Sequence, residues 1–379
     1  MSKMYLRDLI LSKPLLKSLY TKYRSKTAND LMNSSELHNY IEQAEKVLLD
    51  KAPNIVVGLV KGADSYSDMG LVRERDYYPK YERFLRDNDI TYEYYNPFLS
   101  NWMEEAQHFD LIIWHTDSDP ATQMHAGDKI YTLENILNIK CFPSFHELWG
   151  YENKINSHYQ YKAFNLPEIP TFVSHCRDEA ISYVEKCDFP IISKIATGSS
   201  SYGVEKIENK PQALKMINSI FSYQGLKTYF PYFAQKDYVY FQEFIDGAEY
   251  DLRVICIGDK LLGYYRYPNK GDFKASGAGN YEKKEIPVEA LELSYQTRQT
   301  FKASCLATDM VFCKKKNQFL IIESSIFIGV DTCEQLAVNG VPGMYVRDSE
   351  NKYSFVEGKY WIQELALKEY FESNLDYEN

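Results

Sequence analysis

Two apolar segments late in the chain, "CLATDMVFC" (305–313) and "FLIIESSIF" (319–327), flank the polar stretch "KKKNQ" and predict a β-hairpin. A hairpin folded about Lys316 places Asp309 directly opposite Glu323. Directly opposed residues of an antiparallel pair project from one face of the sheet. This pairing constrains the fold strongly, because it brings two carboxylates together beside apolar side chains, where a bare charge is costly to bury.

The two carboxylates repel each other unless a cation lies between them. Ser325 follows Glu323 by two residues and points to the same face, since side chains alternate along a strand. Three oxygen ligands therefore converge, and Mg²⁺ prefers oxygen ligands while leaving positions for phosphate and water. We predict a magnesium site formed by Asp309, Glu323 and Ser325. The alternative is an exposed polar hairpin without a metal, against which the flanking apolar residues argue.

A glycine- and serine-rich loop follows the buried segment of "FPIISKIATGSSSYGV" (189–204), whose strand ends at Lys194. Backbone N–H groups of such a loop can approach phosphate oxygens, while the lysine supplies a point charge. The loop lacks the GxxxxGK-S/T spacing of a P-loop, and a plain hairpin loop would explain it about as well. Its small residues are Gly198, Ser199, Ser200, Ser201 and Gly203.

A third stretch combines a charged hairpin with a long basic loop. Its Gly-Asp turn pairs "DLRVIC" with "LLGYYRY", which sets Asp251 opposite Arg266 and Arg253 opposite Tyr264. Asp251, Arg253 and Arg266 then share a face of the sheet. A cross-strand ion pair on a wet surface is the alternative. The loop that follows, "NKGDFKASGAGN", is longer than the end of a hairpin requires, which favours a binding function.

The order of the remaining segments indicates a mixed α/β and α+β chain. Strand-like and helix-like segments alternate early in the chain, which predicts a parallel sheet with crossover helices. They comprise a helix over 36–52, strands over 54–60, 90–95 and 109–115, and helices over 77–88 and 102–108. A further helix begins near Asn153. From 238 onward the pattern is strand after strand with tight turns, typical of an antiparallel sheet.

Charge and cysteine content narrow the partners and the compartment. A net charge of −10 argues against nucleic acid. Residues 1–26, however, carry seven Lys or Arg and one Asp in two short amphipathic patterns. This segment is either a peripheral anchor on an anionic membrane or a helix that packs on its own domain. Seven scattered cysteines without a CxxC motif, and no apolar run of membrane-spanning length, favour a cytoplasmic protein.

The three stretches, in this order, resemble the ATP-grasp superfamily and most closely its RimK-type carboxylate–amine ligases, over about residues 150–345. The matching motifs are a lid strand that ends in lysine with its glycine-rich loop ("IISKIATGSSSYGV"), a Gln-Glu-aromatic hinge ("FQEFID"), an Asp-hydrophobic-Arg strand ("DLRV"), an F-R-x-S/N loop (here "FKAS") and a metal hairpin. The resemblance implies an ATP-grasp fold with an N-terminal Rossmann-like domain, a lid and a C-terminal antiparallel catalytic sheet.

The resemblance also implies a division of the chain. The expected parts are a basic, helical extension (1–50), a pre-ATP-grasp α/β domain (51–148) and an ATP-grasp domain (149–366), with its lid at about 160–240 and its catalytic sheet at about 241–366. We expect ATP and Mg²⁺ as cofactors and a homodimer as the assembly.

Several matching positions would contact the nucleotide. Lys154, in "ENKI", and the lid residue Lys194 would hold the phosphates of ATP. The backbone of Glu243 and Phe244 would read adenine, and Asp251 would be another nucleotide contact. These assignments follow from the resemblance.

Other positions would carry the chemistry and the metal. Arg253, Arg266 and Lys274 are the expected catalytic cations, of which the last two would steady the acyl phosphate and the oxyanion. Asp309 and Glu323 would bind Mg²⁺. The sequence departs from the family at Ser325, where most relatives carry asparagine, and no "SPG" follows it.

The reaction implied by the resemblance joins a carboxylate to an amine. The γ-phosphate of ATP passes to the carboxylate, ADP leaves, and the amine displaces phosphate from the acyl phosphate. The Glu-x-Ser form with a later "PGMY…EGKYW" is similar to members that accompany surface-polysaccharide biosynthesis, which favours a uronic acid or other sugar acid. The alternatives are a RimK-like amino-acid or peptide ligase, a non-catalytic ATP-binding module and a subunit of a membrane-associated complex.

Substrate selection would involve the rearranged region after Ser325 and part of the N-terminal half. The tyrosine-rich segment 62–82 would help to select the substrates, since tyrosine rings pack on sugar faces. His115 closes the strand "LIIWH" at the edge where α/β sheets place their ligands, which makes it a candidate substrate contact or else a packing residue.

Overall fold

The computed structural model of the chain describes residues 31–32, 34–62, 72–73, 75–198, 203–230 and 232–374. The basic segment 1–26 lies outside these residues, as do Ser199, Ser200 and Ser201 of the glycine-rich loop. In the part of the chain that is described, no helix combines the length and the apolar content needed to cross a bilayer.

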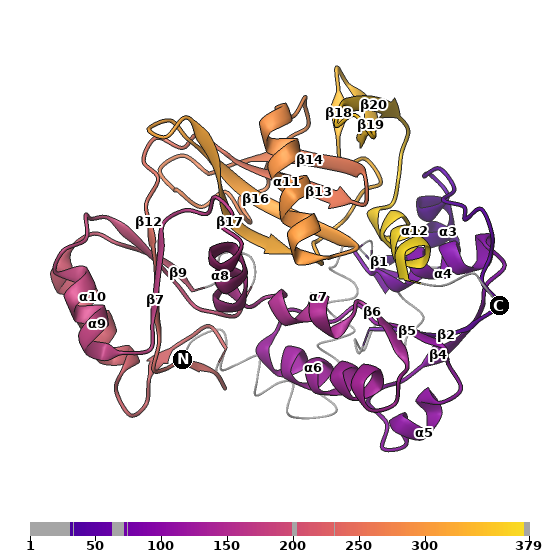
Figure 1. The fold of residues 1–379 in the computed structure, drawn as a ribbon, viewed down its shortest axis with the longest axis horizontal. Coiled ribbons are helices and arrows are strands. Elements are labelled where there is room, and N and C mark those ends of the chain that lie inside the picture. Colours follow the sequence, from indigo (N-terminus) through magenta and orange to yellow (C-terminus); the bar gives the residue numbers. More distant parts are fainter. Residues whose placement is uncertain are drawn as a thin grey trace.

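The N-terminal domain is built on a four-stranded parallel sheet, as the alternation of segments predicted. Its strands, in the order β4-β2-β5-β6, are β4 (Thr91–Tyr95), β2 (Val56–Val60), β5 (Leu111–Ile113) and β6 (Lys140–Phe142). β5 is buried throughout, which explains its uninterrupted apolar sequence. The helices drawn around this sheet in Figure 1 are α4 (Tyr78–Asp87), α5 (Trp102–Ala106), α6 (Pro120–Asn135) and α7 (Phe145–Gly150).

The helix predicted over residues 36–52 is wrong beyond Ile41. The first described helix in the chain is α3 (Ser34–Ile41), and residues 42–55 form no helix. The strand β1 (Leu31–Met32), which precedes α3, pairs with the short strand β3 (Val72–Arg73). The backbone carbonyls of Ile41, Ala44 and Glu45 accept hydrogen bonds from the guanidinium of Arg83, at 2.6, 3.3 and 2.9 Å. A continued helix would use these carbonyls for its own ladder, so the buried arginine keeps this segment irregular.

The predicted lid is a four-stranded antiparallel sheet in the order β7-β12-β8-β9. Its strands are β7 (Thr171–Ser174), β8 (Ile191–Lys194), β9 (Val204–Ile207) and β12 (Val239–Glu243). The helices α9 (Arg177–Val184) and α10 (Lys210–Ile220) share a separate hydrophobic core with it. The lid, shown at the left of Figure 1, also carries the hairpin of β10 (Leu226–Lys227) and β11 (Ala234–Gln235), and α8 (Lys154–Ala163) leads into it.

The C-terminal part is an eight-stranded sheet with the order β17-β16-β13-β14-β19-β18, to which β15 and β20 add at the side. Its strands are β13 (Asp251–Ile257), β14 (Lys260–Tyr267), β15 (Asn280–Glu282), β16 (Cys305–Cys313), β17 (Gln318–Ser325), β18 (Ala337–Val338), β19 (Val341–Arg347) and β20 (Tyr353–Glu357). The predicted fold class, an α/β domain followed by a lid and an antiparallel sheet, is confirmed. The domain boundaries stay predictions.

The expectation of strand after strand from 238 onward is wrong at two helices, α11 (Val288–Phe301) and α12 (Ile362–Asn374). α11 packs on β13 and β16 with Ser294 and Thr297 fully buried among its apolar residues. These polar residues bond to carbonyls, Ser294 to Val254 and Thr297 to Leu293. The apolar stripe that normally marks a packed helix is therefore interrupted in the sequence.

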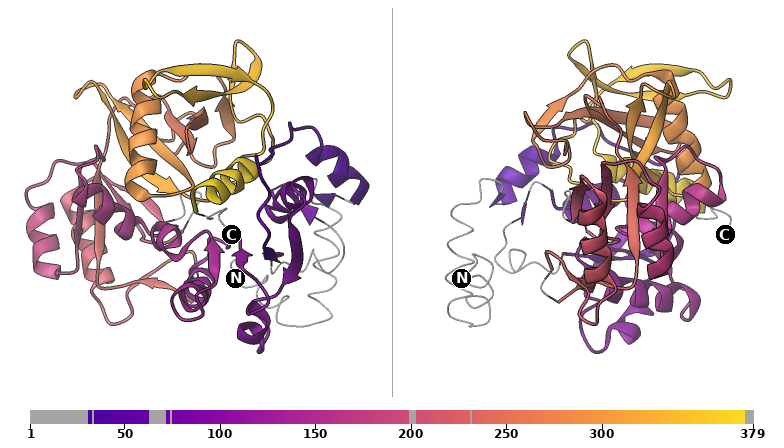
Figure 2. Two further views of the ribbon diagram at one scale, coloured as in Figure 1. Left: turned by 45° about the vertical axis from the view of Figure 1, so that its right-hand side comes forward. Right: turned by 90° about the vertical axis from the view of Figure 1, so that its left-hand side faces the viewer.

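Helix α12 joins the eight-stranded sheet to the N-terminal domain. Figure 2 shows this yellow helix between the sheet and the purple domain. The carboxylate of Glu364 on this helix accepts hydrogen bonds from Nε and Nη2 of Arg83 on α4, at 2.7 and 2.9 Å. Both side chains are 1% exposed. Next to Glu364 the indole of Trp361 donates to the carbonyl of Ile41 at 2.9 Å. The two parts therefore share one core.

Replacing Arg83 by methionine should lower the free energy of unfolding by roughly 3–5 kcal/mol, because Glu364 would stay buried without its partner. Urea denaturation followed by tryptophan fluorescence measures the loss. Arg86→Met is the matched control, since the Arg86 side chain is 53% exposed and should matter by no more than about 0.5 kcal/mol. Equal losses in the two variants would contradict this account of the domain junction.

Candidate functional site

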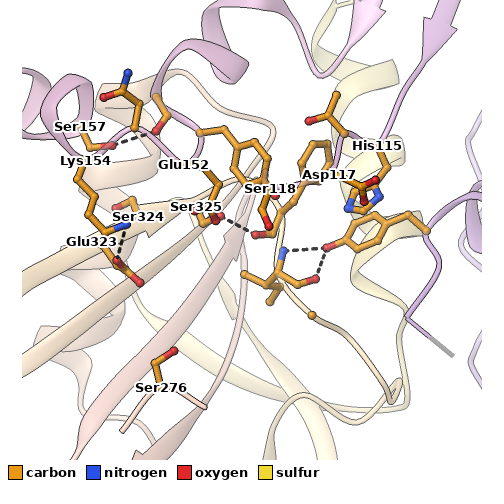
Figure 3. Close-up of a pocket in the computed structure, with 18 of the residues that line it drawn as sticks. His115, Asp117, Ser118, Glu152, Lys154, Ser157, Ser276, Glu323, Ser324 and Ser325 are labelled. Atoms are coloured by element: carbon orange, nitrogen blue, oxygen red, sulfur yellow. Dashed lines mark hydrogen bonds and ion pairs between the residues drawn. The ribbon is translucent and has the colours of Figure 1, made fainter. Parts of the chain in front are cut away.

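Two adjoining cavities lie against the eight-stranded sheet. The small cavity, of about 150 Å³, lies between this sheet and the lid, and the large cavity, of about 480 Å³, lies between the sheet and the N-terminal domain. Both are lined by Lys154, Ser276, Ile322 and Glu323. Figure 3 shows the large cavity, with Lys154 and Glu323 pointing toward each other at one end. The two cavities therefore meet where the sequence places its metal hairpin.

Most of the predicted site residues line the small cavity. These are Lys154, Lys194, Gly198, Glu243, Phe244, Asp251, Arg266, Lys274, Asp309 and Glu323. Arg253 and Ser325 line the large cavity instead, and Gly203 lines neither. A Cβ on Gly203 would lie 2.5 Å from Ile195, and its φ is +69°, so this glycine serves the turn of the loop.

The predicted pairing of Asp309 with Glu323 in the metal hairpin is confirmed, but the register of the hairpin is irregular. Asp309 pairs with Glu323 and Ala307 with Ser325, as expected. From Met310, which pairs with Ile321, to the turn, the register is shifted by one residue. A β-bulge at this point restores the opposition of the two carboxylates, and without it Asp309 would face Ile322. Nothing in the sequence indicates the bulge. A hairpin folded about Lys316 predicts the right pair of carboxylates, but it assumes a regular register that the structure does not have.

Asp309 is held by two arginines from the next two strands of the sheet, β13 and β14. Arg253 donates from Nε to Oδ1 at 2.6 Å and from Nη2 to Oδ2 at 2.7 Å, and Arg266 donates from Nη2 to Oδ2 at 2.6 Å. Arg266 also bonds to Asp251, which it faces in the sheet. Burial alone would raise the pKa of Asp309, but the charges of Arg253 and Arg266 outweigh it and lower that pKa well below its usual range.

These contacts correct one part of the sequence argument. A metal is not needed to neutralise the buried carboxylate, because the two arginines already do so. The Glu323 side chain is 36% exposed, with the Lys154 ammonium 3.9 Å from its Oε2, so it is less buried than its apolar neighbours suggested. Asp251, Arg253 and Arg266 do share a face, as predicted, but they form a buried network and not a wet surface pair.

The donor set can still accept a magnesium ion. Asp309 Oδ1 has one hydrogen bond, which leaves a lone pair, and the opposed Glu323 carboxylate lines the same cavity. Among the described residues no group of three His, Cys, Asp or Glu could hold a metal, so the remaining ligands would come from phosphate and water. The Ser325 hydroxyl donates to the carbonyl of Phe327 at 2.5 Å and lines only the large cavity. Its part as a third ligand stays a prediction.

Two lysines approach the small cavity from different elements. Lys194 ends β8 and is 4% exposed. Its pKa is lowered to about 8, chiefly by burial and also by the charge of Lys154. The negative charge of Glu323 raises this pKa and offsets part of the effect. Lys154 is the first residue of α8, where its N–H donates to the carbonyl of Ala196 and its Nζ to that of Gly198, at 2.8 and 2.6 Å.

The far end of the small cavity is aromatic. The ring of Phe244 meets that of Phe273 edge to face, with centroids 5.9 Å apart, and the ammonium of Lys206 lies 4.6 Å from the Phe244 centroid. The N–H of Glu243 donates to the carbonyl of Pro170 at 2.9 Å. This N–H is therefore already used, and adenine would have to form its hydrogen bonds with other backbone groups of the hinge.

The large cavity contains functional groups that the sequence did not single out. Asp117 and Ser118 follow β5 on the same loop as His115, and all three line this cavity. A contact between His115 and substrate stays a prediction. Glu152 lies just before α8, with φ +51°, and burial raises its pKa to about 7. The strand-end rule that indicated His115 also covers Asp117 and Ser118, which lie two and three positions after it, but no motif pointed to Glu152.

The aromatic residues of the large cavity are mostly packed against one another. His115 stacks on Tyr77 with centroids 4.0 Å apart, and Phe327 meets both rings edge to face. The Tyr77 hydroxyl donates to the carbonyl of Ile328 at 2.8 Å and accepts its N–H at 3.1 Å. Tyr77 thus fastens the segment after the metal hairpin to the N-terminal domain. Of the 62–82 segment predicted to select substrates, residues 63–71 and 74 lie outside the described chain.

Asp309→Asn should lower the free energy of unfolding by roughly 3–5 kcal/mol, because two buried arginines lose the charge that they share. Glu323→Gln is the matched variant on the opposite strand and should cost no more than about 1 kcal/mol, since its side chain is partly exposed. Urea midpoints of the two variants check this. Similar losses would show that the arginines do not hold Asp309 as described.

No family model matches the chain. Among curated proteins, the α-aminoadipate–LysW ligase LysX of Saccharolobus solfataricus is 31% identical over 195 residues, which are 50% of this chain and 62% of that relative. The chain therefore spans less than two thirds of the length of the curated relative that it matches. The match confirms the resemblance to ligases that the motifs predicted.

Solved structures are also similar to the chain. The D-alanine–D-alanine ligase from Bacillus anthracis is 17% identical, with a TM-score of 0.49, over 73% of this chain and 88% of that one. The RimK domain protein ATP-grasp from Sphaerobacter thermophilus is 12% identical, with a TM-score of 0.48, over 71% and 89%. Likeness at this level says nothing about the activity of the chain.

Proposed function

We propose that the chain is an ATP-dependent, ADP-forming carboxylate–amine ligase of the ATP-grasp type, which makes an amide through an acyl phosphate. The observation that carries the proposal is the junction of the two cavities at Lys154 and Glu323. The small cavity has two lysines at this junction and an aromatic end away from it, which suits a nucleotide. The large cavity is polar and wide enough for an acid and an amine.

In the small cavity, Lys194 and Lys154 would bind the phosphates of ATP and Phe244 would pack against its base. Mg²⁺, held by Asp309 and Glu323, would offset the charge of the phosphates when it is bound. Lys274, on the loop that lines the same cavity, would approach the γ-phosphate. Catalysis would consist mainly of positioning and charge stabilisation, since the amine is the nucleophile.

The two arginines that bond to Asp309 would have different functions in the reaction. Arg266 lines the small cavity and Arg253 lines the large one, although both bond to the same carboxylate. Arg266 would stabilise the phosphoryl group as it leaves ATP, and Arg253 would bind the carboxylate that receives it. Asp309 fixes the distance between them, so the two reactants would meet in one geometry.

For the acid we propose a sugar acid such as a uronic acid, as in surface-polysaccharide biosynthesis. The volume of about 480 Å³ and the polar lining of the large cavity support it. The tyrosines give it little support. Five of them line this cavity, but of these only Tyr78 is partly exposed, and Tyr77, Tyr151, Tyr161 and Tyr240 are all less than 9% exposed. Hydroxyl recognition by Asp117, Ser118 and His115 would then replace ring stacking.

An amino-acid ligase is the second candidate. The curated relative joins α-aminoadipate to LysW, and α-aminoadipate is an amino acid with two carboxylates. Arg253 and Arg75, which both line the large cavity, would suit such a dianion. Dimer formation, a cytoplasmic location and membrane contact through residues 1–26 are further proposals.

Full-length protein incubated with ATP, Mg²⁺ and paired acids and amines should release ADP and phosphate and form an amide. A panel of glucuronate, galacturonate, α-aminoadipate and glutamate, each with several amines, separates the two substrate classes by mass spectrometry. Glu323→Gln should abolish turnover and keep the fold. Release of AMP and pyrophosphate would contradict the proposal. ATP binding without turnover, restored by Ser325→Asn, would favour a non-catalytic nucleotide-binding module.

The affinity for ATP should fall about tenfold between pH 7 and pH 9. The free Lys194 has a pKa of about 8, and bound phosphate raises that pKa, so the bound state holds the proton more tightly and affinity is lost as pH rises. Isothermal titration calorimetry measures the slope. In Lys194→Arg the side chain stays charged, and in Lys194→Met it is neutral with much weaker binding, so both slopes should flatten. A wild-type slope in either variant would rule out this lysine as the phosphate ligand.

A further inference from the structure

Glu152 is a carboxylate of the large cavity that the reaction described above does not use. It lies between the buried Tyr151 and Asn153, whose side chain caps α8. Its backbone has φ +51°, a conformation that non-glycine residues seldom adopt and that is found more often at functional sites. Figure 3 shows Glu152 between the Lys154–Glu323 pair and the end of the cavity at His115 and Asp117.

The carboxylate of Glu152 has no hydrogen bond or ion pair with any other residue in the part of the chain that the structure describes. Its electrostatic neighbours are Lys154, Glu323, Arg253 and Asp309. The two cations among them are already engaged, because Lys154 donates to Gly198 and faces Glu323, and Arg253 holds Asp309 with two hydrogen bonds. A cationic group of a ligand would therefore meet a carboxylate that faces no competing partner in the described chain.

The position of Glu152 also fits the course of the reaction. Its neighbours Lys154 and Glu323 line both cavities, so an acyl phosphate formed at the junction would present its carbonyl carbon to the large cavity. An amine that enters from the N-terminal domain would pass Glu152 before it reaches that carbon. Most amines arrive protonated at neutral pH, and an ammonium group cannot attack because its nitrogen has no free electron pair.

We propose that Glu152 binds the ammonium group of the amine substrate and takes its proton. This rests on the proposed ligase function and names the residue that receives the nucleophile. The proton passes from nitrogen to the Glu152 carboxylate, and the freed electron pair forms the C–N bond with the acyl carbon. The bond from that carbon to the phosphate oxygen breaks, phosphate leaves with the electron pair, and it accepts the second N–H proton. Glu152 then returns its proton to solvent through the open cavity.

Hydroxylamine separates this function from a structural one, because it is uncharged at neutral pH and needs neither an anionic partner nor a base. The probes are the acid panel given above, ATP, Mg²⁺ and either hydroxylamine or an ordinary primary amine. Glu152→Gln should form the hydroxamate within about twofold of wild type and lose about a hundredfold in the rate of amide formation. Below the pKa of the amine, the residual amide rate should rise about tenfold per pH unit, as the free amine does.

Glu93→Gln, the same change on the exposed strand β4, should alter neither rate, and Glu152→Asp should recover part of the amide rate. Equal loss of hydroxamate and amide in Glu152→Gln, or loss of neither, would overturn the proposal. If wild-type protein makes no hydroxamate with any acid, the ligase function itself fails, and the function of Glu152 fails with it. Hydroxamate formation by the wild-type protein therefore tells the two failures apart.

Discussion

The hydrogen bonds from Arg253 and Arg266 to Asp309 are the constraint on which the site depends. They join three adjacent strands, β14, β13 and β16, through one buried carboxylate. Because the guanidinium groups of both arginines are fixed to the Asp309 carboxylate, the walls of the two cavities cannot shift independently. The network also keeps Asp309 ionised, which is the form in which a carboxylate binds a magnesium ion.

The contacts that could be derived from the residues alone are encoded locally, whereas most of the residues that line the small cavity were assigned through the resemblance. The pairs Asp251–Arg266 and Asp309–Glu323 followed from turns a few residues away. What the sequence could not predict depends on contacts between distant segments. The bulge at Met310 and the irregular chain after Ile41, whose carbonyls bond to Arg83, have no local signature. The large cavity is likewise built by residues from the N-terminal domain and from the end of β17.

The same distinction explains the tyrosines. The tyrosine-rich segment 62–82 suggested rings that pack on sugar faces, but its residue Tyr77 is buried against His115 and hydrogen-bonded to the backbone of Ile328. Composition gives no information on which ring faces a ligand. The Tyr77 ring instead joins the N-terminal domain to the segment after the metal hairpin, and in the proposed function the polar groups around it would recognise the substrate.

We propose that a carboxylate is activated by transfer of a phosphoryl group at the junction of the cavities. Once an acid is identified, its carboxyl group can be labelled with oxygen-18 and the released phosphate analysed by mass spectrometry. An acyl phosphate requires one labelled oxygen to appear in the phosphate for each amide formed. Unlabelled phosphate, or label in AMP, would contradict the account.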